Sequence, residues 1–200
     1  DVWEHAVRAT EAVPPTEVLR LTMLLHDAGK PAAFTLDEAG VGHAYGHGEK
    51  SRALAEEAMA RLKADRATAE RVALLVGCHD MPLSQEPRLL KRRLNRLGEE
   101  ALRQLIEVQR ADSLAKGTCD AAAVEAWAAG LRDALDALMA QAPCFTLRDL
   151  AVDGRDMMAL GLRGKAVGTC LNALLDGVLD ERLPNNRDAL MAEARRITGG

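Results

Sequence analysis

The chain has 200 residues, of which 48% are apolar, and it carries a formal net charge of -4 at pH 7. A chain of this length and composition can bury a proper core in one large domain or two small ones. The negative charge excludes a general basic surface for nucleic acid, and aromatic residues, at 2% of the chain, are too scarce for an RNA module built on base stacking.

Membrane and disulfide signals are also missing from the sequence. No apolar stretch approaches the ~20 residues of a membrane span, and no signal peptide is visible. The cysteines have no Cys-x-x-Cys spacing, which argues against a zinc finger. We expect a cytoplasmic protein whose thiols are reduced and packed in the core. The cysteines are Cys78, Cys119, Cys144 and Cys170.

Two predicted helices open the chain. Residues 1–13 form the first, and the prolines at 14–15 end it. Thr16 begins the second helix, and Gly29 and Pro31 end it.

The remaining chain is mostly helical by its apolar periodicity. Residues 32–46 keep no helical period, and the apolar residues that alternate on either side of 37–40 predict a small β-hairpin or an ordered loop. Beyond it, the predicted helices are 48–63, 65–78, 88–97, 99–115 and 120–141, followed by two or three short helices in 144–200. Alanine and leucine dominate, which favours helix. We therefore expect an all-α fold, a helical bundle with a small β-hairpin and a helical C-terminal arm.

A histidine and an aspartate stand side by side at the end of the second predicted helix. His26 and Asp27 lie where Gly29 breaks the helix, so both side chains can be aimed at one metal. Imidazole binds most first-row divalent ions, and a carboxylate can bridge two of them. The alternative is that His26 caps the helix end, where a cationic ring is favoured, while Asp27 is solvated.

The other histidines favour the metal interpretation. Three of the five stand at helix ends beside a turn signal, namely His26, His47 and His79. Asp112 lies on the apolar stripe of its helix, where a bare carboxylate is costly to bury. A metal, a buried salt bridge or an N–H donor would each supply its partner. His43 alternates with apolar positions of the hairpin, so we interpret it as a residue that packs within the hairpin or lies at its rim.

The order of these residues resembles the HD superfamily of metal-dependent phosphohydrolases. That pattern is a histidine, a His-Asp pair and a distant aspartate, and two-metal members add two histidines before the last aspartate. The ligands that the resemblance implies are His5, His26, Asp27, His47, His79 and Asp112. Asp27 would bridge the two cations of a divalent metal such as Mg²⁺, Mn²⁺, Ni²⁺ or Co²⁺.

The implied reaction is hydrolysis of a phosphomonoester or phosphodiester by two cations. The family resemblance suggests a nucleotide substrate or an RNA 2′,3′-cyclic end. Asp27 and Lys30 are the predicted catalytic residues, since Lys30 follows Asp27 closely and could contact a phosphate oxygen. Alternatively, Lys30 is a solvent-facing cation at the helix end.

A basic segment follows the fourth predicted helix. Residues 88–96 hold five cations and no acid, namely Arg88, Lys91, Arg92, Arg93 and Arg96. Like charges at helical spacing, with no acidic residue beside them, destabilise an isolated helix slightly. A polyanionic binding partner is therefore one interpretation. An ordinary solvated helix face is the other.

Most of the chain also resembles the C-terminal half of bacterial CCA-adding tRNA nucleotidyltransferases and related poly(A) polymerases. The segments that carry this likeness are 34–40, 46–48, 110–115, 145–156 and 183–187. In that context Arg163 and Lys165, at a helix start, could contact the backbone phosphates of an RNA. Equally, these residues could simply mark the start of an ordinary helix. The resemblance implies tRNA or another RNA as partner. The nucleotidyltransferase head of those enzymes, with its Asp-x-Asp pair, has no counterpart here, so we expect a fragment of a longer protein.

We predict three parts: an HD domain over 1–118, a connector helix over 119–143 that Pro143 ends, and a helical C-terminal arm over 144–200. The favoured function is the HD and RNA-binding portion of a CCA-adding or poly(A)-polymerase-type enzyme. Two alternatives stay open, a stand-alone HD phosphohydrolase acting on small nucleotides and a non-catalytic RNA-binding module.

Overall fold

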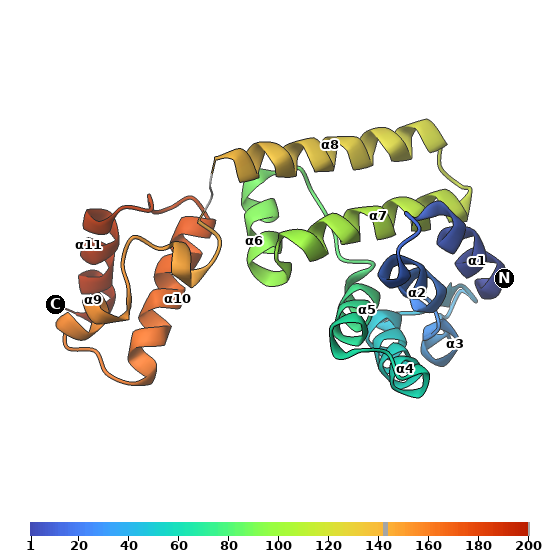
Figure 1. Ribbon diagram of the computed structural model, residues 1–200, viewed down its shortest axis with the longest axis horizontal. Coiled ribbons are helices and arrows are strands. Elements are labelled where there is room, and N and C mark those ends of the chain that lie inside the picture. The colour runs from blue at the N-terminus through green and yellow to red at the C-terminus, as the bar shows by residue number, and fades with distance from the viewer. Residues whose placement is uncertain (142–143, 200) are drawn as a thin grey trace. The chain divides into compact units, whose positions relative to one another are not determined.

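The computed structural model describes residues 1–141 and 144–199. These residues are helical apart from short connections and one two-stranded hairpin (Figure 1), which confirms the all-α fold class. The chain divides into two compact units: Asp1–Leu83 with Glu99–Arg132, and Ser84–Gly98 with Asp133–Gly200. The predicted boundaries at 118 and 143 stay a prediction, and Pro143 lies outside the described residues.

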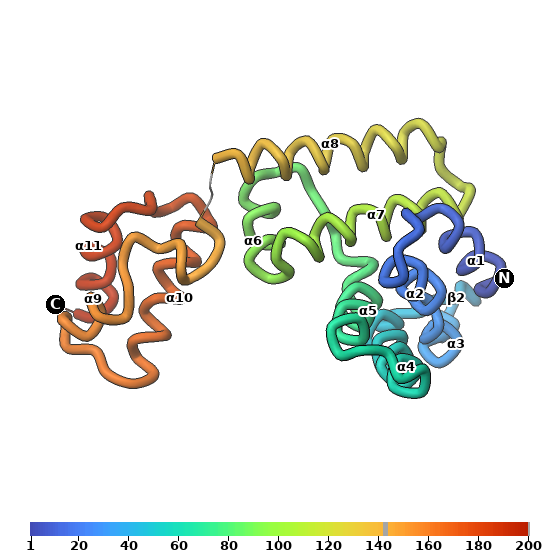
Figure 2. Tube along the Cα trace, viewed as in Figure 1, coloured from blue at the N-terminus to red at the C-terminus, as the bar shows by residue number. Residues whose placement is uncertain are grey.

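The first unit contains most of the helices predicted before residue 118. They are α1 (Val2–Ala12), α2 (Glu17–Leu25), α3 (Lys30–Ala33), α4 (His47–Leu62), α5 (Arg66–Cys78) and α7 (Glu99–Lys116). The strands β1 (Thr35–Leu36) and β2 (Gly42–His43) pair antiparallel, with Thr35 opposite His43. Figure 2 traces this hairpin, with β2 labelled, in the connection from α3 to α4.

Local chemistry sets the ends of these helices. The Thr16 side chain accepts from the backbone N–H of Leu19 and caps α2, and the Asp65 side chain caps α5 in the same way. Lys63 ends α4 in the left-handed region, at φ 55°. One expectation is corrected at α3. Residues 32 and 33, which we expected in a stretch without a helical period, form the end of this short helix. Pro31 lies in its first turn, where the missing N–H of proline costs nothing.

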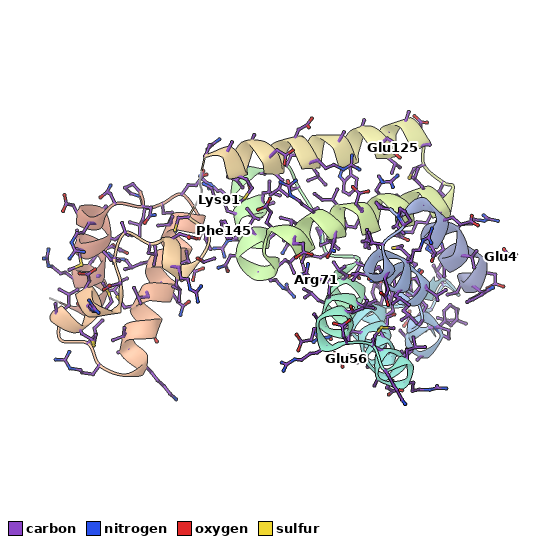
Figure 3. The ribbon with its side chains drawn as sticks, viewed as in Figure 1. Glu4, Glu56, Arg71, Lys91, Glu125 and Phe145 are labelled. Atoms are coloured by element: carbon purple, nitrogen blue, oxygen red, sulfur yellow. The ribbon has the colours of Figure 1, made fainter. Side chains whose placement is uncertain are left out.

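The core of the first unit lies between α1, α2, α4, α5 and α7. Helix α1 packs on α2 and α7, while α5 packs on α2 and α4. Met23, Met59 and Val76 are fully buried there, and each fully buried side chain of this size contributes about 1.5–3 kcal/mol through removal of apolar surface from water. Arg71 of α5 also donates to two side chains of α7 (Figure 3). This packing holds the ends of α2, α4 and α5 close to α7.

Helix α8 (Ala121–Ala140) contributes to both units. Its buried apolar residues recur at helical spacing: Val124, Ala128, Leu131, Leu135 and Leu138. In the first unit, ion pairs join it to α7. Arg110 contacts Glu125 at 2.7 Å, and Arg132 contacts Glu107 at 2.8 Å. Glu125 is labelled on α8 in Figure 3.

The second unit joins α6 to the C-terminal helices. Its elements are α6 (Pro87–Leu97), the end of α8, the 3₁₀ turn η1 (Leu147–Asp149), α9 (Gly154–Ala159), α10 (Lys165–Leu179) and α11 (Arg187–Thr198). Met157, Leu174 and Leu190 are fully buried in its core. Asp153 caps α9, and Arg187 of α11 binds Asp156 of the same capping box through two nitrogens.

None of the helices in the described part of the chain is both long and apolar enough to cross a membrane. All four cysteines are free thiols. Cys78 and Cys170 are buried, but Cys119 is exposed in the connection between α7 and α8. The expectation that every thiol packs in the core is therefore wrong for Cys119.

Candidate metal centre

Six side chains that are far apart in the sequence meet in the first unit. They come from α1, the turn after α2, the start of α4, the turn after α5, and α7. These are the six ligands that the sequence predicted: His5, His26, Asp27, His47, His79 and Asp112. His26, Asp27 and His79 are buried, and the other three are partly buried.

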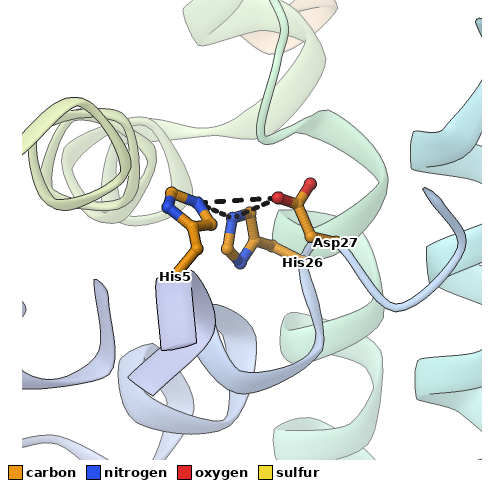
Figure 4. Close-up of side chains that lie close together, drawn as sticks. All are labelled: His5, His26 and Asp27. Atoms are coloured by element: carbon orange, nitrogen blue, oxygen red, sulfur yellow. Dashed lines mark hydrogen bonds and ion pairs between the residues drawn. The ribbon is translucent and has the colours of Figure 1, made fainter. Parts of the chain in front are cut away.

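Asp27 lies between two groups of histidines. Its Oδ2 atom lies 3.5 Å from Nε2 of His5 and 3.3 Å from Nε2 of His26 (Figure 4). Its Oδ1 atom lies 3.3 Å from Nε2 of His47 and 3.7 Å from Nε2 of His79. Each oxygen of this carboxylate therefore faces one group, which is the arrangement a bridging ligand needs.

Backbone carbonyl groups orient three of the histidines. The Nδ1 atoms of His26, His47 and His79 lie 2.6, 2.9 and 2.7 Å from the carbonyl oxygens three residues earlier in the chain. An Nδ1–H that donates to a carbonyl leaves Nε2 as the coordinating nitrogen, as in many protein metal sites. In all three histidines Nε2 points into the cluster.

The cluster fits a divalent cation on two further observations. Nε2 of His5 lies 3.1 Å from Nε2 of His26, and Nε2 of His47 lies 3.0 Å from Nε2 of His79. Each such nitrogen pair needs a shared proton or a cation. The Oδ1 atom of Asp27 is buried and has no hydrogen-bond partner among the described residues, which is costly for a carboxylate. Oxygen and nitrogen ligands of this kind suit first-row divalent metals.

The ligand atoms form two overlapping sets. His5, His26 and Asp27 form the first, and Asp27, His47 and His79 form the second, with all ligand atoms of a set within 4.8 Å of one another. Asp112 adjoins the first set, since its Oδ1 lies 2.9 Å from Nε2 of His5. The geometry can thus hold one cation in each set with Asp27 shared.

Two lysines accompany the two aspartates. Lys30 Nζ lies 2.5 Å from Oδ2 of Asp27, and Lys116 Nζ lies 2.6 Å from Oδ2 of Asp112. Each lysine follows its aspartate by about one helical turn. The sequence analysis singled out Lys30 and missed Lys116, although the i, i+4 spacing of Lys116 from Asp112 is a signal that could have found it.

The electrostatics of the centre are strongly perturbed. Burial opposes the charge of His26, but hydrogen bonds to Asp112 and Asp27 outweigh it and raise the pKa of His26 to about 9. Burial alone would raise the pKa of Asp27, yet His26 and Lys30 hold that pKa well below its usual range. Burial lowers the pKa of His79 and favours its neutral form, which is the form that binds a metal.

A close backbone contact positions the turn that carries His26 and Asp27. A Cβ atom at Gly29 would lie 2.4 Å from the backbone nitrogen of Ser51 and 2.7 Å from the carbonyl oxygen of His47. The N–H of Gly29 also donates to Ser51 Oγ at 2.9 Å. Only glycine allows this approach, which holds the turn against the start of α4.

His43 lies outside the cluster, on the hairpin. Its Nε2 lies 2.8 Å from Oδ2 of Asp37, and its ring stacks on Tyr45 with centroids 5.0 Å apart. This agrees with our interpretation of His43 as a residue of the hairpin or its rim.

The predicted RNA-binding cations belong to the second unit. Arg88 and Lys91 pair with Glu181 at 3.5 and 2.7 Å, and Arg92 pairs with Asp180 at 2.6 Å. The expectation that the cations of α6 have no acidic partners is therefore wrong, because Asp180 and Glu181, which follow α10, pair with them. Arg93 and Arg96 are on the same helix, and Arg163 and Lys165 are exposed at the start of α10. The RNA-binding role of these seven cations stays a prediction.

A cavity of about 510 Å³ adjoins the cluster within the first unit. Asp27, Lys30, His47, His79 and Asp112 all line it. Further lining residues that the sequence analysis did not assign to a site are Gln109, Ser113, Lys116 and Trp127. Trp127 lies at helical spacing from the buried Val124 and Leu131 of α8, so nothing in the sequence pattern separates it from these neighbours.

Fold and site together define an all-α protein with a buried histidine–aspartate centre whose donors suit divalent cations. Residues 48–194 match the family described as "tRNA nucleotidyltransferase domain 2 putative". The chain belongs to this tRNA nucleotidyltransferase family.

Two curated relatives support the assignment. The chain is 31% identical over 198 residues to the CC-adding tRNA nucleotidyltransferase of Thermus thermophilus, an alignment that covers 94% of this chain and 43% of the relative. It is 33% identical over 118 residues to the A-adding tRNA nucleotidyltransferase of Deinococcus radiodurans, covering 56% of this chain and 27% of the relative. The chain thus spans less than half the length of either relative. No solved structure matches it.

Proposed function

We propose that the first unit is a metal-dependent phosphohydrolase centre of the HD type. The observation that carries this proposal is the position of Asp27, whose two carboxylate oxygens face two different groups of histidines. Divalent cations bound here would supply Lewis-acid activation of a phosphoester and of water. The substrates are phosphomonoesters or phosphodiesters of nucleotides or RNA 2′,3′-cyclic ends.

In this proposal the residues of the centre have two roles, metal binding and phosphate binding. His5, His26 and Asp112 would hold one cation together with Asp27, and His47 with His79 would hold the other. Lys30 contacts Asp27 at 2.5 Å and lines the same cavity. With a cation bound at Asp27, the ammonium group of Lys30 would be available to bind a phosphoryl oxygen as a point charge.

Activity with added metals tests the proposal. The purified chain should hydrolyse 2′,3′-cyclic AMP and bis(p-nitrophenyl) phosphate when Mg²⁺, Mn²⁺, Ni²⁺ or Co²⁺ is added in turn, with at least one metal effective. Asp27→Ala should reduce this turnover to background and remove bound metal, because both groups of histidines lose their shared ligand.

Asp37→Asn is the matched control for that variant. Asp37 also contacts a histidine, His43, but lies on the exposed hairpin outside the cluster, so this change should leave turnover and metal content as they are. Stoichiometric metal retained by a folded Asp27→Ala protein would rule out the assigned centre.

We further propose that the chain is the RNA-binding portion of a longer tRNA nucleotidyltransferase of the CCA-adding or poly(A)-polymerase type. Membership of the family and the names of the two relatives support a tRNA partner. The cations of α6 and those at the start of α10 are the candidates for phosphate contacts. A chain that binds tRNA but hydrolyses no phosphoester with any metal would instead be a non-catalytic RNA-binding module.

A further inference from the structure

The cavity beside the metal centre is lined by two chemically different sets of residues. The charged set consists of four of the proposed metal ligands, two lysines and one further acid: Asp27, His47, His79, Asp112, Lys30, Lys116 and Asp80. The other set is apolar and comprises Met81, Pro82, Ala123, Val124 and Trp127. A simple phosphate or a small phosphoester would need only the charged set.

Helix α8 supplies most of the apolar wall. Ala123, Val124 and Trp127 occupy positions i, i+1 and i+4, so they share one face of the helix. Trp127 is half-buried. Among residues 1–141 and 144–199 it stacks on no other ring, and its indole N–H donates no hydrogen bond. A large aromatic side chain therefore lines the cavity without an aromatic partner of its own.

Polar groups accompany this wall. Gln109 of α7 donates its amide N–H to the carbonyl oxygen of Met81 at 2.6 Å, which fixes its orientation and leaves its Oε1 atom as an acceptor. Ser113, one turn further along α7, also lines the cavity. A mainly apolar wall with a few fixed polar groups, in a volume of about 510 Å³, is typical of a site for a small organic ligand.

We propose that this cavity is a nucleobase subsite in which Trp127 stacks on the base of a nucleotide whose phosphoester lies at the metal centre. The inference rests on the proposed phosphohydrolase function and adds the residue that makes it selective for nucleotides over other phosphoesters. Aromatic stacking suits any base, since every base has a flat π-face. Lys116 lines the same cavity beside Asp112, so its ammonium group is available to contact a phosphate oxygen of such a ligand.

Two matched cyclic esters test the proposal. Adenosine 2′,3′-cyclic phosphate and methyl riboside 2′,3′-cyclic phosphate present the same phosphodiester with and without a base. Trp127→Ala should lower kcat/KM for the adenosine ester at least about 10-fold, mostly through KM, and leave the base-free ester unchanged. Trp127→Phe should restore most of the loss, since phenylalanine also stacks. Equal losses on both esters, or no loss on either, would overturn the subsite.

A binding measurement separates this proposal from the phosphohydrolase function. The chain has two tryptophans, and Trp3 is exposed on α1 and lines no part of this cavity. In a Trp3→Phe protein with Mn²⁺, adenosine 2′-monophosphate should therefore quench the fluorescence of Trp127, and ribose 2-phosphate should not. If no ester is hydrolysed, the phosphohydrolase proposal fails while quenching still decides the subsite. Absence of quenching, or equal quenching by both ligands, would refute the subsite even in an active enzyme.

Discussion

At the scale of single residues, Asp27 and His26 have different tasks although they are adjacent. Asp27 offers one oxygen to each group of histidines, so it is the residue that the two halves of the centre share. His26 is fully buried, and a carbonyl group orients its ring. Asp112 and Asp27 stabilise the charged form of that ring, and a bound cation would compete with this proton for Nε2.

The stability of the metal-free protein should therefore fall as pH rises. The pKa of His26 is raised from 6.5 to about 9 in the folded chain. A raised histidine pKa stabilises the folded state fully below pH 6.5 and loses that contribution as pH rises through 9. With EDTA present, urea unfolding should show a loss of about 3 kcal/mol between these two pH values.

His26→Gln serves as the reference for this measurement. The variant lacks the titrating group, so its stability should change much less over the same pH interval. The same slope in the variant and the parent protein would show that another group is responsible. Added metal should reverse the trend, because a metal binds the deprotonated imidazole more tightly as pH rises.

At the scale of elements, the centre depends on how α2, α3 and α4 meet. The turn after α2 carries two ligands, and α4 begins with a third, His47. Gly29 lies between them in direct contact with the backbone of α4. The spacing of His26 and Asp27 from His47 therefore depends on this close backbone contact as well as on side-chain packing.

Gly29→Ala should disturb both folding and metal binding. The added methyl group would collide with backbone atoms of α4, which cannot move aside as a flexible side chain could. Overpacking of this kind costs about 1–3 kcal/mol or more. Urea unfolding should report the destabilisation, and a Mn²⁺ titration should show weaker binding.

Gly168→Ala is the matched control for this change. Gly168 lies inside α10, and an added methyl group there would have no atom within 4 Å, so alanine should stabilise the helix by about 0.5–1 kcal/mol. Equal effects of the two substitutions would refute the close-contact argument.

At the scale of the whole molecule, each of the two units is built from two separate stretches of the chain. Residues 84–98 leave the first unit, supply α6 to the second, and the chain then re-enters the first through α7. The cations of α6 meet acids that lie about 90 positions later in the sequence. In a chain of negative net charge, such pairs set how much positive charge α6 can offer to an RNA.

Neutralising one of these acids should strengthen tRNA binding. Asp180→Asn removes the nearer of the two acids that pair with Arg92, the other being Asp176 at 3.5 Å. Affinity for tRNA should therefore rise, and the slope of log K against log salt should steepen by up to about 0.9 for one added phosphate contact. Arg92→Gln should do the opposite. Filter binding at several salt concentrations measures both slopes. Unchanged slopes in both variants would remove α6 from the proposed RNA contact.

The sequence by itself determined the helices and the residue types of the centre. Apolar periodicity, the cap at Thr16 and the hairpin alternation gave the all-α fold with one small hairpin, because these signals act over a few residues. His26, His47 and His79 could be selected from the sequence because helix ends beside turns aim side chains away from the helix.

Only the tertiary structure decided which groups face one another. The two sides of Asp27, the acids opposite α6 and the place of Trp127 in the cavity wall all depend on contacts between segments far apart in the chain. A helical stripe gives every apolar position the same pattern, whether a neighbouring helix or a cavity lies opposite. Burial and pairing are properties of the packed molecule, so periodicity alone could not supply them.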